Sequence, residues 1–233
     1  MGKSRLIVID GLDGSGKGTQ VNRVKEWLES KGVTVRILDY PNYSEPSSTL
    51  VKMYLNGEIS DTPDEINAFA ASSFYAVDRY ISYIQHWKDD YERGDIVFLA
   101  NRYVSSNLIH QMAKLDRDYW GDYEKWLYDY EFGKLGLPKP DMTIILDVPV
   151  DISQKLMAER YNGDENKKDL HESDLDYLAR CHKTLGCAIL QPCWYSIKCT
   201  ENGVMRSQEC ITNDIISLIM YHNVLSDFIK GGD

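Results

Sequence analysis

The hydrophobic positions of the chain alternate between short continuous runs and longer stretches with helical spacing. The runs are rich in Val, Ile and Leu and about six residues long, which is typical of strands buried on both faces. They predict five strands, at residues 5–10, 33–38, 95–100, 142–147 and 194–199.

Apolar residues at helical spacing and helix-start signals occupy the intervals between these runs. The clearest start is residues 62–65, with a threonine cap, proline at the first helical position and glutamate three residues after the cap. The predicted helices cover residues 19–31, 48–55, 63–93, 151–160, 173–185 and 207–228. This alternation predicts an α/β fold, a five-stranded parallel sheet flanked by helices on both faces. Ligands of such sheets bind at the carboxyl ends of the strands.

A glycine-rich stretch, residues 11–19, joins the first predicted strand to the first helix. The pattern G-x-x-x-x-G-K-[ST] holds at three fixed positions and fails at the fourth, where Gly18 stands and Thr19 follows. Free N–H groups and the helix dipole favour an anion at this place, and Lys17 adds a mobile cation. The predicted phosphate-binding residues are Gly11, Gly14, Ser15, Gly16, Lys17, Gly18 and Thr19.

The 233 residues carry a formal net charge of −10, and no linker or repeat divides them. The charge argues against a general affinity for nucleic-acid polymers or anionic membranes. We therefore expect a single domain, residues 1–233, that concentrates its few cations at a nucleotide site.

The five cysteines lie in the last quarter of the chain, and none forms a C-x-x-C pair. A structural zinc site is therefore not expected. No signal-peptide pattern and no apolar run of about 20 residues is present, so we expect a cytoplasmic protein with reduced thiols and no membrane span.

Five motifs, in order along nearly the whole chain, resemble those of the thymidylate kinases, a family of P-loop nucleoside monophosphate kinases. They are residues 10–19, 40–43, 75–79, 101–107 with His110 and Gln111 beyond, and 169–172. The resemblance implies a P-loop NTPase fold with a mobile lid at about residues 160–172. It also implies ATP-dependent phosphorylation of dTMP to dTDP, with ATP as co-substrate and Mg²⁺ as cofactor. A homodimer is implied as well, for which Met53, Tyr54 and Phe69 are apolar candidates, although a core would explain them equally well.

Residue chemistry assigns the parts of this reaction. Tyr75 can stack on a flat base, and Arg79, one helical turn on, can donate to a pyrimidine carbonyl. Asn107 and Gln111 carry both a donor and an acceptor, whereas Phe74 is predicted to be a core aromatic. Together with the resemblance, this predicts an acceptor nucleotide site of Asp13, Tyr43, Tyr75, Arg79, Arg102, Asn107, His110, Gln111, Asp169 and Glu172.

Phosphoryl transfer spreads negative charge over oxygens between two nucleotides, so a fixed guanidinium there stabilises the transition state. Arg102 follows a predicted strand at such a position, and Asp13 resembles the loop carboxylate that orients acceptor and metal. The predicted catalytic residues are Lys17, Arg102 and Asp13.

The polar segment after residue 160 is expected to close over the phosphates and exclude water. Its cations are Arg160, Lys167 and Lys168, and Ser15 stands where some relatives carry a loop arginine. The lid is thus the expected source of positive charge on the donor side, and a solvated run of charges is the alternative.

Four residues depart from the family pattern. Asn101 replaces an aspartate, Asn42 an arginine and Asp10 a glutamate, and His110 stands where an aromatic often stacks. No direct metal ligand is predicted, Thr19 and Asn101 being the nearest candidates.

These departures leave other functions open: a kinase for another nucleoside monophosphate or a nucleoside, or a catalytically impaired nucleotide-binding protein. Restoring the charge by Asn101→Asp is predicted to raise kcat.

Overall fold

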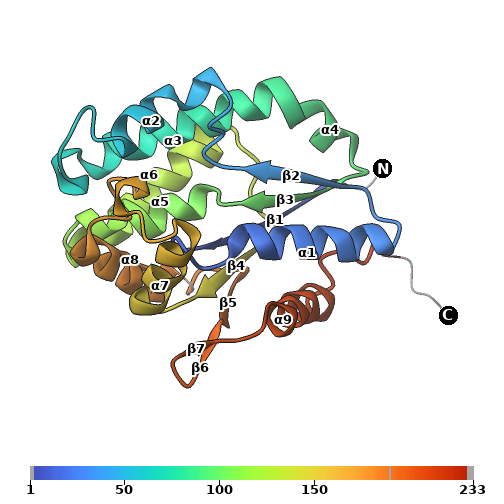
Figure 1. The fold of residues 1–233 in the computed structure, drawn as a ribbon. Coiled ribbons are helices and arrows are strands. Elements are labelled where there is room, and N and C mark those ends of the chain that lie inside the picture. The colour runs from blue at the N-terminus through green and yellow to red at the C-terminus, as the bar shows by residue number, and fades with distance from the viewer. Residues whose placement is uncertain (1–2, 189, 230–233) are drawn as a thin grey trace.

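The computed structural model describes residues 3–188 and 190–229 and contains a five-stranded parallel sheet in the order β2-β3-β1-β4-β5. The strands are β1 (Arg5–Gly11), β2 (Val35–Asp39), β3 (Val97–Asn101), β4 (Met142–Asp147) and β5 (Trp194–Lys198). All five predicted strands are therefore confirmed, with shifts of one or two residues at some ends. The carboxyl ends of the strands lie at one edge of the sheet (Figure 1).

Helices cover both faces of the sheet (Figure 1). They are α1 (Lys17–Ser30), α2 (Thr49–Leu55), α3 (Ala68–Ser82), α4 (Lys88–Arg93), α5 (Val104–His110), α6 (Trp120–Tyr128), α7 (Val150–Arg160), α8 (Leu175–Ala188) and α9 (Gln208–Tyr221). Within residues 3–188 and 190–229, no helix is both long and apolar enough to cross a membrane.

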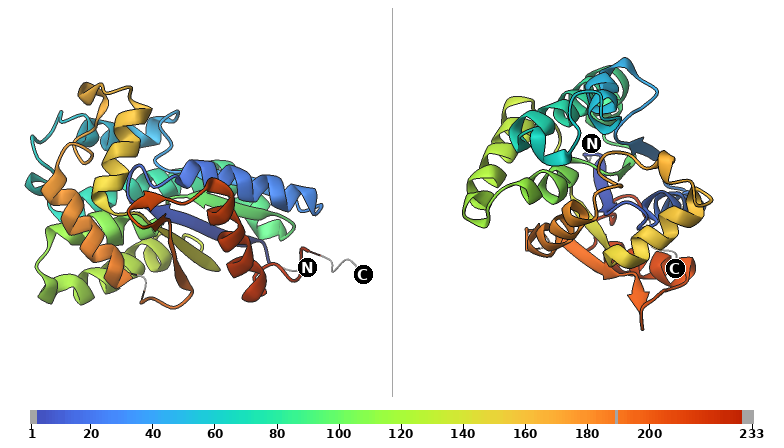
Figure 2. Two further views of the ribbon diagram at one scale, coloured as in Figure 1. Left: turned by 60° about the horizontal axis from the view of Figure 1, so that its bottom comes forward. Right: turned by 60° about the vertical axis from the view of Figure 1, so that its left-hand side comes forward.

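Alternate strand residues divide the core between the two faces, because successive side chains of a strand point in opposite directions. Ile7 and Ile9 pack with residues of α1 and α9. These two helices lie side by side in both orientations (Figures 1 and 2). Leu6 and Val8 pack on the other face with residues of α3, α5 and α6. The near-continuous apolar runs of the sequence follow from this two-sided burial.

The helix predicted over residues 63–93 ends at Arg93 as predicted but begins only at Ala68, and its course is interrupted by a π-helical turn. Residues Pro63–Glu65 form one 3₁₀ turn, and Ile66 is extended. The cap of α3 is instead Asn67, whose side chain accepts a hydrogen bond from the N–H of Ala70 at 2.9 Å. A π-helical turn, Tyr83–Trp87, then joins α3 to α4.

Other elements were not predicted at all. They include α5, α6, a second π-helical turn (Asp129–Lys134) and a small antiparallel hairpin of β6 (Thr200–Glu201) and β7 (Val204–Met205). The last helix, predicted to reach residue 228, ends at Tyr221. Short 3₁₀ turns occupy Pro46–Ser48, Met112–Lys114, Arg117–Tyr119 and Glu165–Lys167.

Candidate functional site

The glycine-rich loop leaves the carboxyl end of β1 and leads directly into α1. Gly14 and Gly16 have positive φ angles of 75° and 84°. A Cβ on Gly14 would lie 2.5 Å from the carbonyl oxygen of Ser153, so that no larger residue fits there. The side chain of Ser15 is buried, which leaves the main chain to face the space above the loop.

That space is an open cleft, called here the loop cleft. Its walls include residues 13–20 of the loop and the start of α1, Asp39 and Asn101 at the strand ends, Arg160 at the end of α7, and Lys167 from the segment that follows. Arg206 also lines it, and the sequence did not indicate this cation because it directly follows the unpredicted hairpin.

Lys17 lies beneath the loop with its ammonium group held by main-chain oxygens. Its Nζ donates to the carbonyl oxygens of Gly11 at 3.1 Å and Leu12 at 2.8 Å. Burial lowers the pKa of Lys17 to about 8, and the neighbouring Arg102 adds to this shift. A buried cation with two neutral acceptors is well placed to move to a phosphate oxygen, which would stabilise its charge.

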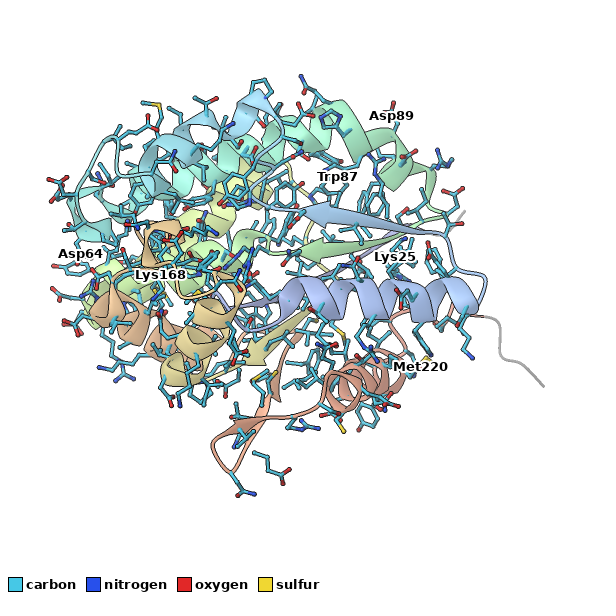
Figure 3. All side chains as sticks on the ribbon, viewed as in Figure 1. Lys25, Asp64, Trp87, Asp89, Lys168 and Met220 are labelled. Atoms are coloured by element: carbon cyan, nitrogen blue, oxygen red, sulfur yellow. The ribbon has the colours of Figure 1, made fainter. Side chains whose placement is uncertain are left out.

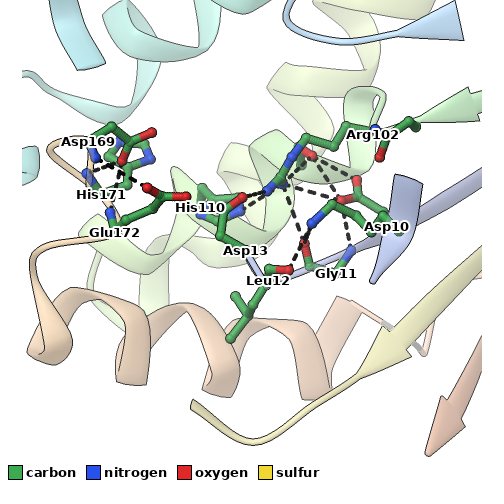
Figure 4. A network of polar contacts seen from close by, with 12 residues as sticks. Asp10, Gly11, Leu12, Asp13, Arg102, His110, Asp169, His171 and Glu172 are labelled. Atoms are coloured by element: carbon green, nitrogen blue, oxygen red, sulfur yellow. Dashed lines mark hydrogen bonds and ion pairs between the residues drawn. The ribbon is translucent and has the colours of Figure 1, made fainter. Parts of the chain in front are cut away.

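Arg102 lies at the end of β3 in a left-handed backbone conformation, with φ 67°. Its Nη2 forms an ion pair with Asp13, and its Nη1 lies 3.5 Å from Asp10 (Figure 4). Burial alone would raise the pKa of Asp13, but Arg102 and Lys17 hold it well below its usual range. The Asp13 carboxylate therefore stays ionised and fixes the guanidinium.

Asp10, the shortened residue of the loop motif, is buried and fully satisfied. It accepts hydrogen bonds from the hydroxyls of Ser105 at 2.6 Å and Ser106 at 2.8 Å, and from the N–H of Gly11 at 2.8 Å. These bonds tie the start of α5 to the end of β1.

A second, narrower pocket opens beside the loop, and it is called here the inner pocket. It brings together nine of the ten residues predicted to bind an acceptor nucleotide: Asp13, Tyr43, Tyr75, Arg79, Arg102, Asn107, His110, Gln111 and Asp169. The tenth, Glu172, lines the loop cleft instead. Phe74 packs edge-on against buried Tyr54, as predicted for a core aromatic.

The guanidinium of Arg79 is less free than the sequence suggested. It is 2% exposed and makes a two-pronged ion pair with Glu131, with Nε–Oε2 at 2.7 Å and Nη2–Oε1 at 2.6 Å. Glu131 takes up Nε and one N–H of Nη2, so the donors that remain are those of Nη1, 3.4 Å from the carbonyl oxygen of Tyr103, and the second N–H of Nη2. Glu131 lies in the second π-helical turn, which sequence analysis did not predict.

His110 and Gln111 carry buried polar atoms that lack partners among the described residues, Nδ1 of the histidine and Oε1 of the glutamine. Burial, reinforced by Arg102, lowers the pKa of His110 to about 4, so the ring is neutral at pH 7. Nη1 of Arg102 can only donate, and it lies 3.2 Å from Nε2 of His110. The ring proton must therefore be on Nδ1, an unsatisfied donor. His171, which was not predicted, stacks on His110 with ring centroids 5.7 Å apart.

The lid segment covers the carboxyl end of the sheet and contributes acids as well as cations (Figure 3). Asp169 accepts from the N–H groups of His171 and Glu172, both at 2.9 Å. Burial, with the nearby Asp13, raises the pKa of Asp169 to about 7. Glu172, whose pKa burial also raises, accepts from the hydroxyl of Tyr161 at 3.0 Å.

The three lid cations are not equivalent. Arg160 and Lys167 line the loop cleft, whereas Lys168 donates to Oε1 of Gln154 at 2.9 Å and lines a separate surface hollow. The structure thus brings two of the three predicted cations to the loop.

Asn101 is paired with a carboxylate that the sequence analysis overlooked. Asp39 and Asn101 are register partners at the ends of β2 and β3, and Nδ2 of Asn101 donates to Oδ1 of Asp39 at 2.7 Å. Oδ1 of Asn101 is buried without a partner among the described residues. Asn42 contributes its N–H, which donates to Asp78 at 2.9 Å.

The cysteines take no part in this site. All five are free thiols, and within the described ranges no group of three or more His, Cys, Asp or Glu residues could hold a metal ion.

Comparisons with known proteins found similar sequences and a similar fold. A family model described as thymidylate kinase matches residues 9–211. The thymidylate kinase of Mycobacterium tuberculosis (strain ATCC 25618 / H37Rv) is 30% identical over 177 residues, covering 75% of this chain and 81% of the relative. A probable thymidylate kinase of Thermococcus onnurineus is 29% identical over 217 residues, covering 92% and 96%. A solved thymidylate kinase structure from Candida albicans superimposes with a TM-score of 0.69 at 19% identity, covering 95% and 93%, which shows a shared fold.

Proposed function

Because the chain belongs to the thymidylate kinase family and is therefore an ATP-dependent dTMP kinase, we propose that ATP lies in the loop cleft and dTMP in the inner pocket. The observation that carries this arrangement is that the two spaces share walls: Asp13, Tyr43 and Arg102 line both. The phosphates of two nucleotides would thus meet at Arg102. The relatives reported above are named as thymidylate kinases, which favours dTMP over the other acceptors and over an inactive binder.

On the donor side, the main chain of residues 13–19 and the ammonium group of Lys17 hold the ATP phosphates. Lys17 exchanges two carbonyl oxygens for phosphate oxygens, and the negative charge restores its full protonation. Arg160 and Lys167 add positive charge around the cleft, and Arg206 lines it while paired with Asp214 at 2.8 Å. Closure of the lid over this charge would exclude water from the transfer.

Transfer itself is a direct attack of a dTMP phosphate oxygen on the γ-phosphorus of ATP, with ADP as leaving group. The attacking oxygen is already a nucleophile, so positioning and charge neutralisation suffice, and no covalent protein intermediate is needed. Arg102, held by Asp13, stabilises the charge that spreads between the two nucleotides.

The family implies Mg²⁺, and the residues present fit a hard cation that prefers oxygen ligands. The carboxylate of Asp39 and the unpartnered oxygen of Asn101 lie at the cleft, where Thr19 also contributes a hydroxyl. We assign the metal to this corner, where it would neutralise phosphate charge. The carboxylate that Asn101 lacks is thus supplied by the neighbouring strand.

A homodimer would use an exposed apolar stripe along α3 and the π-helical turn after it. Val77, Tyr80 and Ile84 are 37%, 37% and 46% exposed, at helical spacing on one face. Of the three residues suggested by the sequence, Tyr54 is fully buried and cannot take part. Met53 is half-buried, and Phe69 is 41% exposed although one side of its ring packs against Tyr123 and Trp126. Sedimentation of a Tyr80→Lys variant tests the assignment, because a monomer is expected, and an unchanged dimer would contradict it.

The reaction is tested by ADP formation with a panel of acceptors, dTMP, dUMP, dCMP, dGMP and thymidine, against a control without acceptor. We expect the highest kcat/KM with dTMP. Tight binding of dTMP and ATP without turnover would overturn the assignment as an active enzyme, and faster turnover of another monophosphate would overturn the acceptor.

A further inference from the structure

Glu131 lies behind the wall of the inner pocket and contacts two residues that face it. Its carboxylate is 0% exposed, receives the two-pronged ion pair from Arg79, and accepts a hydrogen bond from Nδ2 of Asn107 at 3.0 Å. Arg79 and Asn107 lie on different helices, α3 and α5, so Glu131 joins them across the pocket wall.

A carboxylate can only accept hydrogen bonds, and this fixes the orientation of the Asn107 amide. The amino group must face Glu131, and it also donates to the carbonyl oxygen of Ser72 at 3.3 Å. The amide oxygen is consequently turned away from Glu131. The same carboxylate occupies Nε and one N–H of Nη2 of Arg79, so the donors left for a ligand are those of Nη1 and the second N–H of Nη2.

The polar pattern of the pocket wall is then fixed. Arg79 offers a donor to the pocket and Asn107 offers an acceptor. The side-chain oxygen of Gln111, Oε1, is a second acceptor. Gln111 is 1% exposed, and its Oε1 has no hydrogen-bond partner among the described residues. A 4-oxopyrimidine has a carbonyl oxygen that can accept from Arg79 and, beside it, a ring N–H that can donate to the Asn107 oxygen, so it matches this order of donor and acceptor. A 4-aminopyrimidine, with a ring acceptor beside an amino donor, opposes it at both positions.

We propose that Glu131 is a positioning residue that sets the selectivity of the inner pocket for 4-oxopyrimidine over 4-aminopyrimidine monophosphates by fixing the hydrogen-bonding direction of Arg79 and Asn107. The inference rests on the proposed function, since it needs a nucleotide base in this pocket. Glu131 itself does not line the pocket and touches no substrate.

The local structure favours this role over a purely stabilising one. Buried ion pairs seldom add net stability, because desolvation offsets their attraction. The Glu131 side chain also comes from a π-helical turn, an irregularity that is frequent at functional sites. Stability alone does not account for these two features, whereas both are explained if the pair orients the pocket wall.

The test is Glu131→Gln, which keeps the shape but replaces one acceptor with a donor. That donor opposes the N–H groups of Arg79 or Asn107, so the amide of Asn107 is free to flip. We expect KM for dTMP to rise at least tenfold with KM for ATP within twofold. The ratio of kcat/KM for dTMP to that for dCMP should fall at least tenfold.

Asp141→Asn is the matched control. Asp141 accepts from the N–H of Leu6 at 2.8 Å and pairs with Arg5 at the amino-terminal side of the sheet, away from both nucleotide spaces. It should lower thermal stability without changing the dTMP to dCMP ratio. If Glu131→Gln does not fold, Glu131→Asp retains the charge that Arg79 requires but is too short to hold both partners, and the same changes are expected.

The proposal is overturned if either Glu131 variant keeps the wild-type dTMP to dCMP ratio, or if KM for ATP rises as much as KM for dTMP. Failure of the proposed function is a separate result, because it would appear as absent turnover of dTMP by the unmodified protein.

Discussion

The loop cleft and the inner pocket meet at the same edge of the sheet, yet main-chain groups dominate the first and side chains dominate the second. The floor of the cleft is one continuous segment, whose residues 13–19 expose main-chain groups and the single lysine of the loop, although other elements also line it. The inner pocket depends on side chains from several elements, including α3, α5, the loop after β2 and the lid. A phosphate can be held by backbone groups that any sequence possesses, whereas a base must be read by side chains with a fixed donor and acceptor order.

The two regions also differ in how their charges are compensated. In the cleft, Lys17 has neutral partners and keeps a lowered pKa, so it is ready to take a new anion. In the pocket, two N–H groups of Arg79 are bound by Glu131, and the proposed role of this pair is to direct the remaining donors of the guanidinium. Mutations should therefore affect rate on the donor side and selectivity on the acceptor side.

The largest effect is expected from Lys17→Met, which removes the cation that is proposed to bind the ATP phosphates. We expect kcat to fall by about 10²- to 10³-fold, as for the loss of a strong electrostatic contact to a transition state. The control is Lys25→Met on the same helix (Figure 3), where the lysine pairs at the surface with Glu29. Retention of a tenth of the activity by Lys17→Met would contradict the assignment, and ADP formation measures both variants.

A smaller effect is expected at the strand ends, where the carboxylate is on Asp39 of β2 and the neighbouring residue of β3, Asn101, is uncharged. Asp39→Asn should lower kcat about tenfold and raise the Mg²⁺ concentration required, because hard cations favour carboxylates. The structure alters the expectation for Asn101→Asp, because the new carboxylate would lie beside Asp39 and the two negative charges would repel each other. Asn101→Asp is therefore expected to raise kcat only in a protein that already carries Asp39→Asn.

The double variant Asp39→Asn/Asn101→Asp is thus expected to recover wild-type kcat and Mg²⁺ dependence. Asp95→Asn, at the other end of β3, is the control and should change neither quantity. Full activity of Asp39→Asn at low Mg²⁺ would remove Asp39 from the metal site.

The smallest effect is a pH dependence confined to the donor side. Burial lowers the pKa of Lys17 to about 8, so its cation is complete below pH 7 and half lost at about pH 8. Because kcat/KM reports the free enzyme, kcat/KM for ATP should fall twofold at that pH and further above it. With ATP bound the cation is restored, so kcat should stay level.

The variant Asp169→Asn is the control. The pKa of Asp169 is raised to about 7, and the decline is assigned to Lys17 with its pKa of about 8, so the decline should remain when Asp169 is replaced. An alkaline decline that remained in Lys17→Met would assign the titration to another group.

The sequence of this chain determined the sheet, the phosphate loop and most of the residues around the inner pocket. Apolar runs encode buried strands directly, and the loop is a local motif whose glycines allow left-handed conformations that other residues adopt only rarely. Nine of the ten predicted acceptor residues line one pocket because the carboxyl ends of parallel strands meet at one edge.

Only the tertiary structure decided which partner each polar group has. Glu131 and Asp39 lie 52 and 62 residues from Arg79 and Asn101, and neither belongs to a recognisable motif. A hydrogen bond requires two atoms within about 3 Å in a suitable direction, and that relation arises when distant segments pack. Charge and residue type were therefore readable from the chain, but the direction in which each donor and acceptor points was settled by the fold.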